Sequence, residues 1–263
     1  MSEDVTPNLA EFRTSPLLAG AGFRHAFFTR RGGVSTGPYA SLNFSVKVGD
    51  SASSVQTNLE RAAAALGVDP SRTFFLSQVH GADARVLGEG DQRQDVLFCE
   101  ADALIGVDPA SAVAVRIADC IPILVGDRAS GAALAIHAGW RGVVAGVIER
   151  AVDRLRELVG GPGDLVAAIG PHITLPAFEV SDDVATTLLS CSPDPAVVDR
   201  SFGAKPHVDL GAIASAKLRQ IGLSDNSVDR VPGCTVSEPG AFFSYRRDGA
   251  RSGRHLAAIV PQG

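Results

Sequence analysis

Short apolar runs alternate with amphipathic stretches along the whole chain, and this alternation predicts both strands and helices. The apolar runs predict strands at residues 25–29, 73–79, 101–107, 112–118, 121–125, 132–136, 166–169, 242–245 and 256–260. Apolar positions at helical spacing predict helices at residues 55–66, 144–159, 181–189 and 209–221. Strands therefore outnumber helices, and several connections are too short for a crossover helix, which favours an α/β fold with mixed sheets.

One pair of strands is predicted more specifically. The apolar runs 121–125 and 132–136 are joined by a glycine-containing turn at residues 127–131. Neighbouring apolar runs with such a turn between them are typical of a hairpin, and the lack of polar positions indicates that it is buried. We therefore expect these two strands to lie side by side in the core.

Composition narrows the class of protein. The chain has 263 residues, of which 45% are hydrophobic and 20% charged, and this excludes disordered, collagen-like and coiled-coil proteins. The net charge of −5 provides no general field for nucleic acid or anionic membranes. We find no signal peptide and no run of about 18 apolar residues. The four cysteines are scattered without a CxxC pair, which indicates reduced thiols and a cytoplasmic protein.

Three segments place reactive side chains beside strand ends, at residues 77–81, 118–122 and 137–142. Cys120 follows one apolar strand and His137 ends the predicted hairpin, so the two are candidates for spatial neighbours. His80 ends another strand. Two imidazoles and one thiolate suffice to hold zinc with a fourth position left open for water or substrate.

Spacing alone leaves two other interpretations open. Cys120 can be an ordinary buried apolar residue, with both histidines satisfied by backbone partners. Cys120 can also be a nucleophile, with His137 as its base and Asp119 as the group that orients the base. The spacing of these residues does not separate a thiol enzyme from a metal site.

Six motifs follow one another along the chain: FTRRGGVS at 28–35, YASLN at 39–43, QVHG at 78–81, ADCIP at 118–122, HAGWRG at 137–142 and FFSYRRDG at 242–249, with Gly253-Arg254 near the end. In this order they resemble the YfiH family, also known as DUF152, which was first described as laccase-like polyphenol oxidases and later as purine nucleoside phosphorylases. The resemblance covers residues 23 to 260, and the segment 1–22 outside it is expected to be flexible.

The resemblance implies a single-domain sandwich of mixed sheets over residues 1–263, with helices packed outside the sheets. It also implies a zinc ion held by His80, Cys120 and His137. The implied activity is phosphorolysis of adenosine, inosine, guanosine and methylthioadenosine, with adenosine deamination as a side activity. The family usually has Cys-Tyr where this chain has Ala177 and Phe178, so no role is assigned to those two positions.

Phosphorolysis requires an anion site beside the glycosidic bond. Arg30 and Arg31 precede a flexible Gly-Gly turn and are candidates for phosphate binding, as are Arg246 and Arg247. With 21 arginines in the chain, about half of such residues are expected to be ordinary surface charges. Asn43 is a candidate for hydrogen bonding to the base or ribose, and a turn-forming asparagine is the alternative.

Other site roles follow from the zinc interpretation. Asp119 is expected to orient a ligand histidine, or else to cap a turn. Deamination needs a group that shuttles a proton, and Glu179 is the candidate because it is the carboxylate near one of the motifs. Trp140 is expected to pack beneath the following helix rather than to form the floor of the pocket.

Three alternatives come from other functional classes. A laccase ranks lower, because the only methionine is Met1 and the six histidines contain no His-x-His pair, although copper can occupy the zinc position. A metal-independent cysteine hydrolase using Cys120 and His137 is the second alternative. A non-catalytic purine-binding domain is the third. The expected partners are a purine nucleoside and phosphate, without nucleic acid or membrane, and a monomer is favoured.

Overall fold

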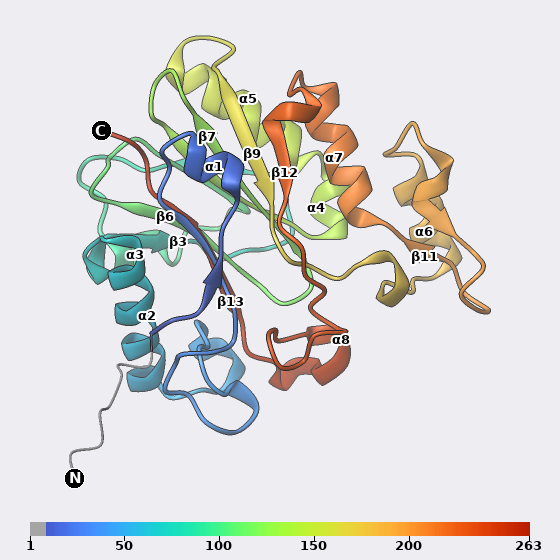
Figure 1. Ribbon diagram of the computed structural model, residues 1–263, viewed down its shortest axis with the longest axis horizontal. Coiled ribbons are helices and arrows are strands. Elements are labelled where there is room, and N and C mark those ends of the chain that lie inside the picture. The colour runs from blue at the N-terminus through green and yellow to red at the C-terminus, as the bar shows by residue number, and fades with distance from the viewer. Residues whose placement is uncertain (1–8) are drawn as a thin grey trace.

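The computed structural model describes residues 9–263, and two sheets form its centre (Figure 1). The five-stranded sheet contains, from edge to edge, β1 (Phe12–Arg13), β2 (His25–Phe28), β13 (His255–Ile259), β6 (Ala112–Ile117) and β3 (Thr73–Phe75). The six-stranded sheet contains β12 (Val228–Arg230), β9 (Leu165–Ile169), β7 (Ile121–Asp127), β8 (Ala133–Ala138), β5 (Ala103–Gly106) and β4 (Ala84–Val86). A separate ribbon pairs β10 (Val198–Asp199) with β11 (His207–Val208).

Both large sheets are mixed, as the sequence predicts. The pairs β3–β6, β4–β5 and β9–β12 are parallel, and the remaining pairs are antiparallel. The predicted hairpin is confirmed: β7 and β8 pair antiparallel, with Ile123 opposite Ile136. Every residue of these two strands is buried, because both faces of their sheet are covered.

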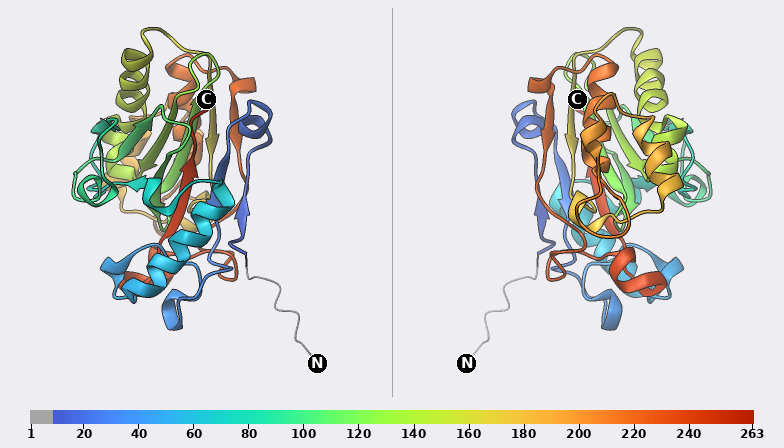
Figure 2. Two further views of the ribbon diagram at one scale, coloured as in Figure 1. Left: turned by 90° about the vertical axis from the view of Figure 1, so that its left-hand side faces the viewer. Right: turned by 90° about the vertical axis from the view of Figure 1, so that its right-hand side faces the viewer.

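The two sheets pack face to face between outer helices. Phe27 and Phe74 from the smaller sheet meet Leu104 and Leu124 from the larger one in a shared core. The outer face of the six-stranded sheet is covered by α5 (Val147–Val159) and α7 (Leu210–Gln220). The outer face of the five-stranded sheet is covered by α2 (Ala52–Leu66). The result is the α/β sandwich expected from the sequence, seen from its sides in Figure 2.

The predicted helices at 55–66, 181–189 and 209–221 are confirmed as α2, α6 (Asp182–Leu189) and α7. The predicted helix at 144–159 is two helices, α4 (Trp140–Ala145) and α5. Gly146 separates them because its φ of 83° is left-handed, and its N–H donates to the carbonyl of Val143. The remaining α-helices in the described part of the chain are α1 (Pro16–Gly20), α3 (Arg93–Val96) and α8 (Tyr245–Asp248), and short 3-10 helices occur in the connections.

The predicted strand at 242–245 is wrong, because this segment leads directly into α8. Phe242 and Phe243 are buried, so the segment is apolar without being part of a sheet. The Ser244 side chain accepts from the N–H of Arg247 and begins the helix. The Asp119 carboxylate accepts a hydrogen bond from the N–H of Arg246, which also lies in the first turn of α8. The helical conformation of this segment is therefore stabilised by one local side chain, Ser244, and by one that is distant in sequence, Asp119.

The N-terminal segment 1–22, expected to be flexible, contains two regular elements in its described part. β1 pairs with β2, and α1 begins at Ser15, whose side chain accepts from the N–H of Leu18. Ser15 is fully buried, and its N–H donates to His25. Residues 1–8 lie outside the described part of the chain. Across residues 9–263, no helix combines the length and hydropathy needed to cross a bilayer.

Candidate active site

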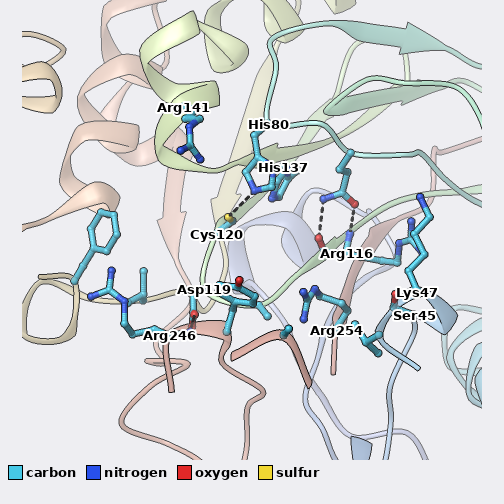
Figure 3. A pocket seen from close by; sticks show the side chains of 17 residues that line it. Ser45, Lys47, His80, Arg116, Asp119, Cys120, His137, Arg141, Arg246 and Arg254 are labelled. Carbon is cyan, nitrogen blue, oxygen red and sulfur yellow. Dashed lines mark hydrogen bonds between the residues drawn. The ribbon is translucent and has the colours of Figure 1, made fainter. Parts of the chain in front are cut away.

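A cavity of about 630 Å³ opens where loops from both sheets meet (Figure 3). One wall carries a thiol and two imidazoles. The other walls carry cationic side chains from distant parts of the sequence, and Phe178 and Tyr245 add aromatic surface. The cationic residues that line the cavity are Lys47, Arg116, Arg141, Arg246 and Arg254.

The first wall consists of the three residues that the sequence predicts as metal ligands. Their donor atoms all lie within 4.8 Å of one another, and Cys120 Sγ is 3.8 Å from His80 Nε2. The imidazole rings of His80 and His137 meet edge to face, with centroids 4.9 Å apart. His80 follows β3, Cys120 lies between β6 and β7, and His137 is in β8, so three separate segments converge here.

Strand pairing and one glycine explain this convergence. His137 lies opposite Pro122 in the hairpin, so the turn that carries Cys120 stays beside β8. Gly139 follows two residues later and leaves the necessary space. A Cβ at Gly139 would lie 2.8 Å from His80 Cδ2 and 3.1 Å from Cys120 Sγ. Any larger residue at this position would therefore push the cluster apart.

The carboxylate beside the cluster is not the one that the sequence predicts. His137 Nδ1 donates to Asp102 Oδ1 at 2.7 Å, and Asp102 is fully buried. Asp119, the expected orienting residue, accepts instead from Thr235 Oγ1 and from the N–H of Arg246, each at 2.6 Å. Asp119 therefore fixes the start of α8 and lines the pocket, and Asp102 orients His137.

The cluster strongly perturbs its own pKa values. Burial raises the pKa of the Cys120 thiol, but the charge and hydrogen bonds of His137 and His80 outweigh burial and lower it to about 6. Burial lowers the pKa of His137, but the Cys120 thiolate and Asp102 outweigh burial and raise it to about 9. Without a bound cation, the pair is therefore a thiolate and an imidazolium at neutral pH.

Two arginines from neighbouring strands form the opposite wall. Arg116 is in β6, and Arg254 directly precedes β13, which pairs with β6. Burial lowers the pKa of both guanidinium groups. The charge of Arg254 adds to burial and brings the pKa of Arg116 to about 10, whereas the charges of Cys120 and Asp119 partly offset burial at Arg254. Both remain charged at neutral pH. Two like charges held together and partly desolvated make a site that favours an anion.

The structure shows what holds these two arginines. The guanidinium of Arg116 stacks over the ring of Phe75, 4.6 Å from the centroid, and donates to the carbonyl of Leu76. The guanidinium of Arg254 donates to the carbonyls of Ser252 and Gly253. Each group therefore uses part of its donors on the protein. Neither arginine was predicted as a site residue: Arg254 belongs to a matched motif but was given no role, and Arg116, one of 21 arginines, lies in none of the motifs.

Of the four arginines predicted to bind phosphate, only Arg246 lines this cavity. Arg30 donates to the carbonyls of Ala40 and Pro239 and stacks on an aromatic ring. Arg31 donates to a carbonyl and lies 3.6 Å from a glutamate carboxylate. Arg247 donates to three backbone carbonyls. These three join loops to one another and do not line this cavity.

Asn43 also has a different position from the one expected. It is fully buried, and its side chain donates to Ser45 and Asp50. Its Oδ1 accepts from the N–H groups of Ser45 and Arg254. All of its hydrogen-bonding capacity is used within the protein, so Asn43 does not line the pocket. It holds in place the backbone of an arginine that does.

The candidate proton shuttle lies in a neighbouring groove. Glu179 is exposed, pairs with Lys205 at 3.3 Å and lines a shallow surface groove together with Trp140. Phe178 and Arg246 form the wall between this groove and the main cavity. Glu179 is therefore outside the main cavity, and so is Trp140, which was expected to pack rather than to form the floor.

The donor set of the cluster fits a zinc ion. The two imidazoles and the thiolate are the ligand types that zinc prefers, and three protein ligands leave a fourth position open. His137 presents Nε2 to the cluster because Nδ1 is hydrogen bonded to Asp102. The separation of 3.8 Å between Cys120 Sγ and His80 Nε2 is close to the ~3.5 Å expected for two ligands of one tetrahedral ion.

Fold and site together define the class: a mixed-sheet α/β sandwich with a two-histidine, one-cysteine cluster in a cationic cavity. Residues 24–262 match the family model described as multi-copper polyphenol oxidoreductase laccase. The crystal structure of YlmD from Geobacillus stearothermophilus superposes with a TM-score of 0.87 at 29% identity, covering 97% of this chain and all of that one.

The amino-acid sequence of this chain is also similar to those of curated proteins. A purine nucleoside phosphorylase of Streptomyces coelicolor is 38% identical over 241 residues, which cover 91% of this chain and 95% of the relative. The purine nucleoside phosphorylase YfiH of Shigella flexneri is 37% identical, over 84% of this chain and 86% of the relative. The chain therefore belongs to the YfiH family, and the resemblance found in its motifs is confirmed.

Proposed function

We propose that this protein is a purine nucleoside phosphorylase, which cleaves the glycosidic bond with phosphate to give a free purine and ribose 1-phosphate. The observation that carries the proposal is a single cavity with a thiol–imidazole cluster on one wall and Arg116 and Arg254 on the other. Relatives over about nine-tenths of the chain bear the name of this activity. The proposed nucleosides are adenosine, inosine, guanosine and methylthioadenosine.

Phosphate binding is assigned to the arginine wall. Arg254 and Arg116 face the cavity with part of their guanidinium donors engaged by backbone carbonyls, which fixes their orientation. Guanidinium groups form short, charge-assisted hydrogen bonds with phosphate oxygens. Lys47 lies at the same cavity and donates to Ser77. The arginine wall would hold phosphate in position to attack the anomeric carbon, so that the reaction becomes effectively intramolecular.

Nucleoside binding is assigned to the aromatic surface. Phe178 is buried and Tyr245 is exposed, and both line the cavity. Aromatic rings stack on purines regardless of their exocyclic groups, in keeping with a broad set of purine substrates. The guanidinium of Arg246 lies 5.6 Å from the centroid of Phe178 and donates to the carbonyl of Glu179, so the ring and the cation form one surface.

Zinc is the proposed cofactor, held by Cys120 Sγ, His80 Nε2 and His137 Nε2, and copper in the same position would give a weak oxidase signal. When bound, zinc acts as a Lewis acid and lowers the pKa of a coordinated water, which is the chemistry that the proposed adenosine deamination requires. Asp102 keeps His137 Nδ1 protonated and so directs Nε2 toward the cluster.

The test is a chromatographic assay of purified protein with inosine or adenosine, with and without phosphate. We expect hypoxanthine or adenine together with ribose 1-phosphate only when phosphate is present, and inosine from adenosine as the deamination product. Free ribose in place of ribose 1-phosphate would indicate hydrolysis. No base release in either arm, together with unchanged purine binding by Cys120→Ala, would support a non-catalytic binding domain.

A second candidate is a metal-independent cysteine hydrolase, and one observation favours it. Asp102, His137 and Cys120 have the order of a carboxylate, an imidazole and a thiol in a catalytic triad. Metal analysis separates the two candidates. A protein without tightly bound zinc, whose activity is lost when Cys120 alone is alkylated, would favour the thiol enzyme.

A laccase remains the less favoured candidate despite the description of the family model. Across residues 9–263, the cluster of His80, Cys120 and His137 is the one group of three or more His, Cys, Asp or Glu side chains able to hold an ion. A multicopper centre needs many more imidazoles than this. The proposed compartment is the cytoplasm, because all four cysteines are free thiols.

A further inference from the structure

Asp102 accepts hydrogen bonds from two of the segments that form the cluster of His80, Cys120 and His137. Its Oδ1 accepts from His137 Nδ1 at 2.7 Å and from the N–H of His80 at 3.0 Å. Its Oδ2 accepts from the N–H groups of Val79 and Gly81, at 3.2 and 2.7 Å. The residue is fully buried, and its own N–H and C=O are used in pairing with neighbouring strands. One carboxylate therefore joins β8 to the loop that carries His80.

All four partners of this carboxylate are donors, so only a group with two acceptor oxygens satisfies them. An asparagine would place its amide nitrogen opposite two N–H donors whichever way it turned. With Asp102 fully buried, no water compensates the loss. The four donors therefore require an ionised carboxylate at this position.

The bonds to the backbone fix an unusual conformation. His80 has a φ of 61°, one of two positive values among the described non-glycine residues. The N–H groups of residues 79, 80 and 81 all point at the same carboxylate, and this arrangement wraps the loop around Asp102. The wrapped loop brings His80 Nε2 within 3.8 Å of Cys120 Sγ. The bond to His137 separately decides which ring nitrogen faces the cluster.

We propose that Asp102 is the positioning residue of the metal centre: it holds the imidazoles of both His80 and His137 in the arrangement that a cation needs. This inference rests on the proposed function only in assuming that the cation is zinc. Orienting carboxylates behind ligand histidines commonly contribute tenfold to a hundredfold to metal affinity. Asp102 differs from a simple partner of one histidine because it also sets the backbone of the second.

The first test compares the zinc affinity of Asp102→Asn with that of the wild type by competition with a chelator. We expect a dissociation constant raised at least tenfold. Asp83→Asn is the matched control, since Asp83 is exposed in the same segment and should leave the affinity unchanged. A dissociation constant within threefold of the wild type for Asp102→Asn would overturn the inference.

The melting temperature of Asp102→Asn, measured with and without zinc, distinguishes a purely structural role of Asp102 from a role in positioning the zinc ligands. A variant that is merely less stable loses melting temperature in both states and keeps the rise produced by zinc. A variant with displaced ligands loses part of that rise, because ligand binding stabilises the fold according to its affinity. We expect the zinc-dependent rise to shrink in Asp102→Asn, and an unchanged rise would contradict the positioning role.

If Asp102→Asn does not fold, a measurement on the wild-type protein tests the inference instead. Nuclear magnetic resonance of protein with ¹⁵N-labelled histidine should show a slowly exchanging proton on His137 Nδ1, with or without zinc. Rapid exchange of that proton, or a proton on Nε2 in the zinc-loaded protein, would refute the inference. A wild type that binds no zinc but shows this proton would remove the zinc proposal and leave the hydrogen bond to Asp102 established.

Discussion

The two walls of the cavity are built in different ways. The thiol–imidazole wall takes Cys120 and His137 from the adjoining ends of β7 and β8 and His80 from the loop between β3 and β4. Asp102 fixes the two histidines through one buried carboxylate. The arginine wall takes Arg116 from within β6 and Arg254 from the position directly before β13, and each is held by aromatic stacking or backbone carbonyls. The first wall depends on position along strands, and the second depends on tertiary packing.

This difference has a consequence for mutation. The cluster works as a unit, because a cation needs all of its ligands at once. The arginine wall contains several cations around one cavity, so the removal of one should weaken the binding of an anion rather than abolish it. Substitutions on the two walls should therefore differ in magnitude and in the kinetic parameter that they change.

The largest effect is expected for Cys120→Ser. Because the loss of an orienting carboxylate already costs tenfold to a hundredfold in metal affinity, the loss of a ligand should cost more than about 100-fold. Zinc content and phosphorolysis should fall together, measured by metal analysis and by the chromatographic assay. Cys99→Ser, a change at a half-buried thiol away from the cavity, should keep both. Full zinc occupancy in Cys120→Ser would show that the thiol is not a ligand.

Arg254→Met should produce a smaller and more selective effect. The loss of charge-assisted hydrogen bonds worth roughly 1.5–3 kcal/mol should raise KM for phosphate about 10- to 100-fold while zinc content stays the same. Arg31→Met is the control, because Arg31 was predicted from the sequence but donates to the carbonyl of Gly240 and does not line the cavity. A larger rise in KM for Arg31→Met than for Arg254→Met would reverse our assignment of the arginine wall.

We expect His255, the residue after Arg254, to make the free energy of unfolding depend on pH. His255 directly follows Arg254, is buried, and accepts from the N–H of Phe243 through Nε2. Burial lowers the pKa of His255 to about 3, against about 6.5 in the unfolded chain. The unfolded state therefore binds more protons between these values, and stability falls as pH drops below about 6.5.

This contribution should amount to at most about 1.4 kcal/mol per pH unit in that interval. Urea unfolding at pH 7 and at pH 5 measures it. His255→Gln, which keeps an acceptor for the N–H of Phe243 but does not titrate, should show a weaker loss of stability between the two values. An equal loss in both proteins would place the pH dependence in other groups.

The smallest effect is expected for Glu179→Gln. Glu179 pairs with Lys205 in the neighbouring groove and does not line the cavity, so it is not placed to transfer a proton there. We expect adenosine deamination to change less than about threefold, by analogy with other exposed ion pairs, which contribute little. A loss of deamination with phosphorolysis preserved would return Glu179 to the role that sequence analysis gave it.

The parts of the site that the sequence predicts are those set by local pattern. His80, Cys120 and His137 end apolar runs, and the confirmed hairpin of β7 and β8 brings two of those ends together. Asp102 was not selected, although it is the second residue of the predicted strand 101–107, because a buried aspartate near a strand start has no spacing signature. Its function becomes visible only when the loop 79–81 is seen wrapped around it.

The arginines that line the cavity could not be predicted from the sequence for a different physical reason. A guanidinium group is long and flexible, so the direction it takes depends on neighbours contributed by other segments. Arg30 is held by a carbonyl more than 200 positions away, that of Pro239, and no local pattern encodes that contact. The strand predicted at 242–245 failed similarly, since Asp119 caps the start of α8 from a distance of more than 120 positions.

The central claim is that the two walls act together on one nucleoside, and ³¹P nuclear magnetic resonance tests it most directly. Protein stripped of metal, and the same protein reloaded with zinc, are incubated with inosine and inorganic phosphate. We predict that a sugar 1-phosphate signal grows as the inorganic phosphate signal declines in the reloaded sample, and that the stripped sample shows little change. Hypoxanthine release without any sugar 1-phosphate, or equal rates in both samples, would contradict the account.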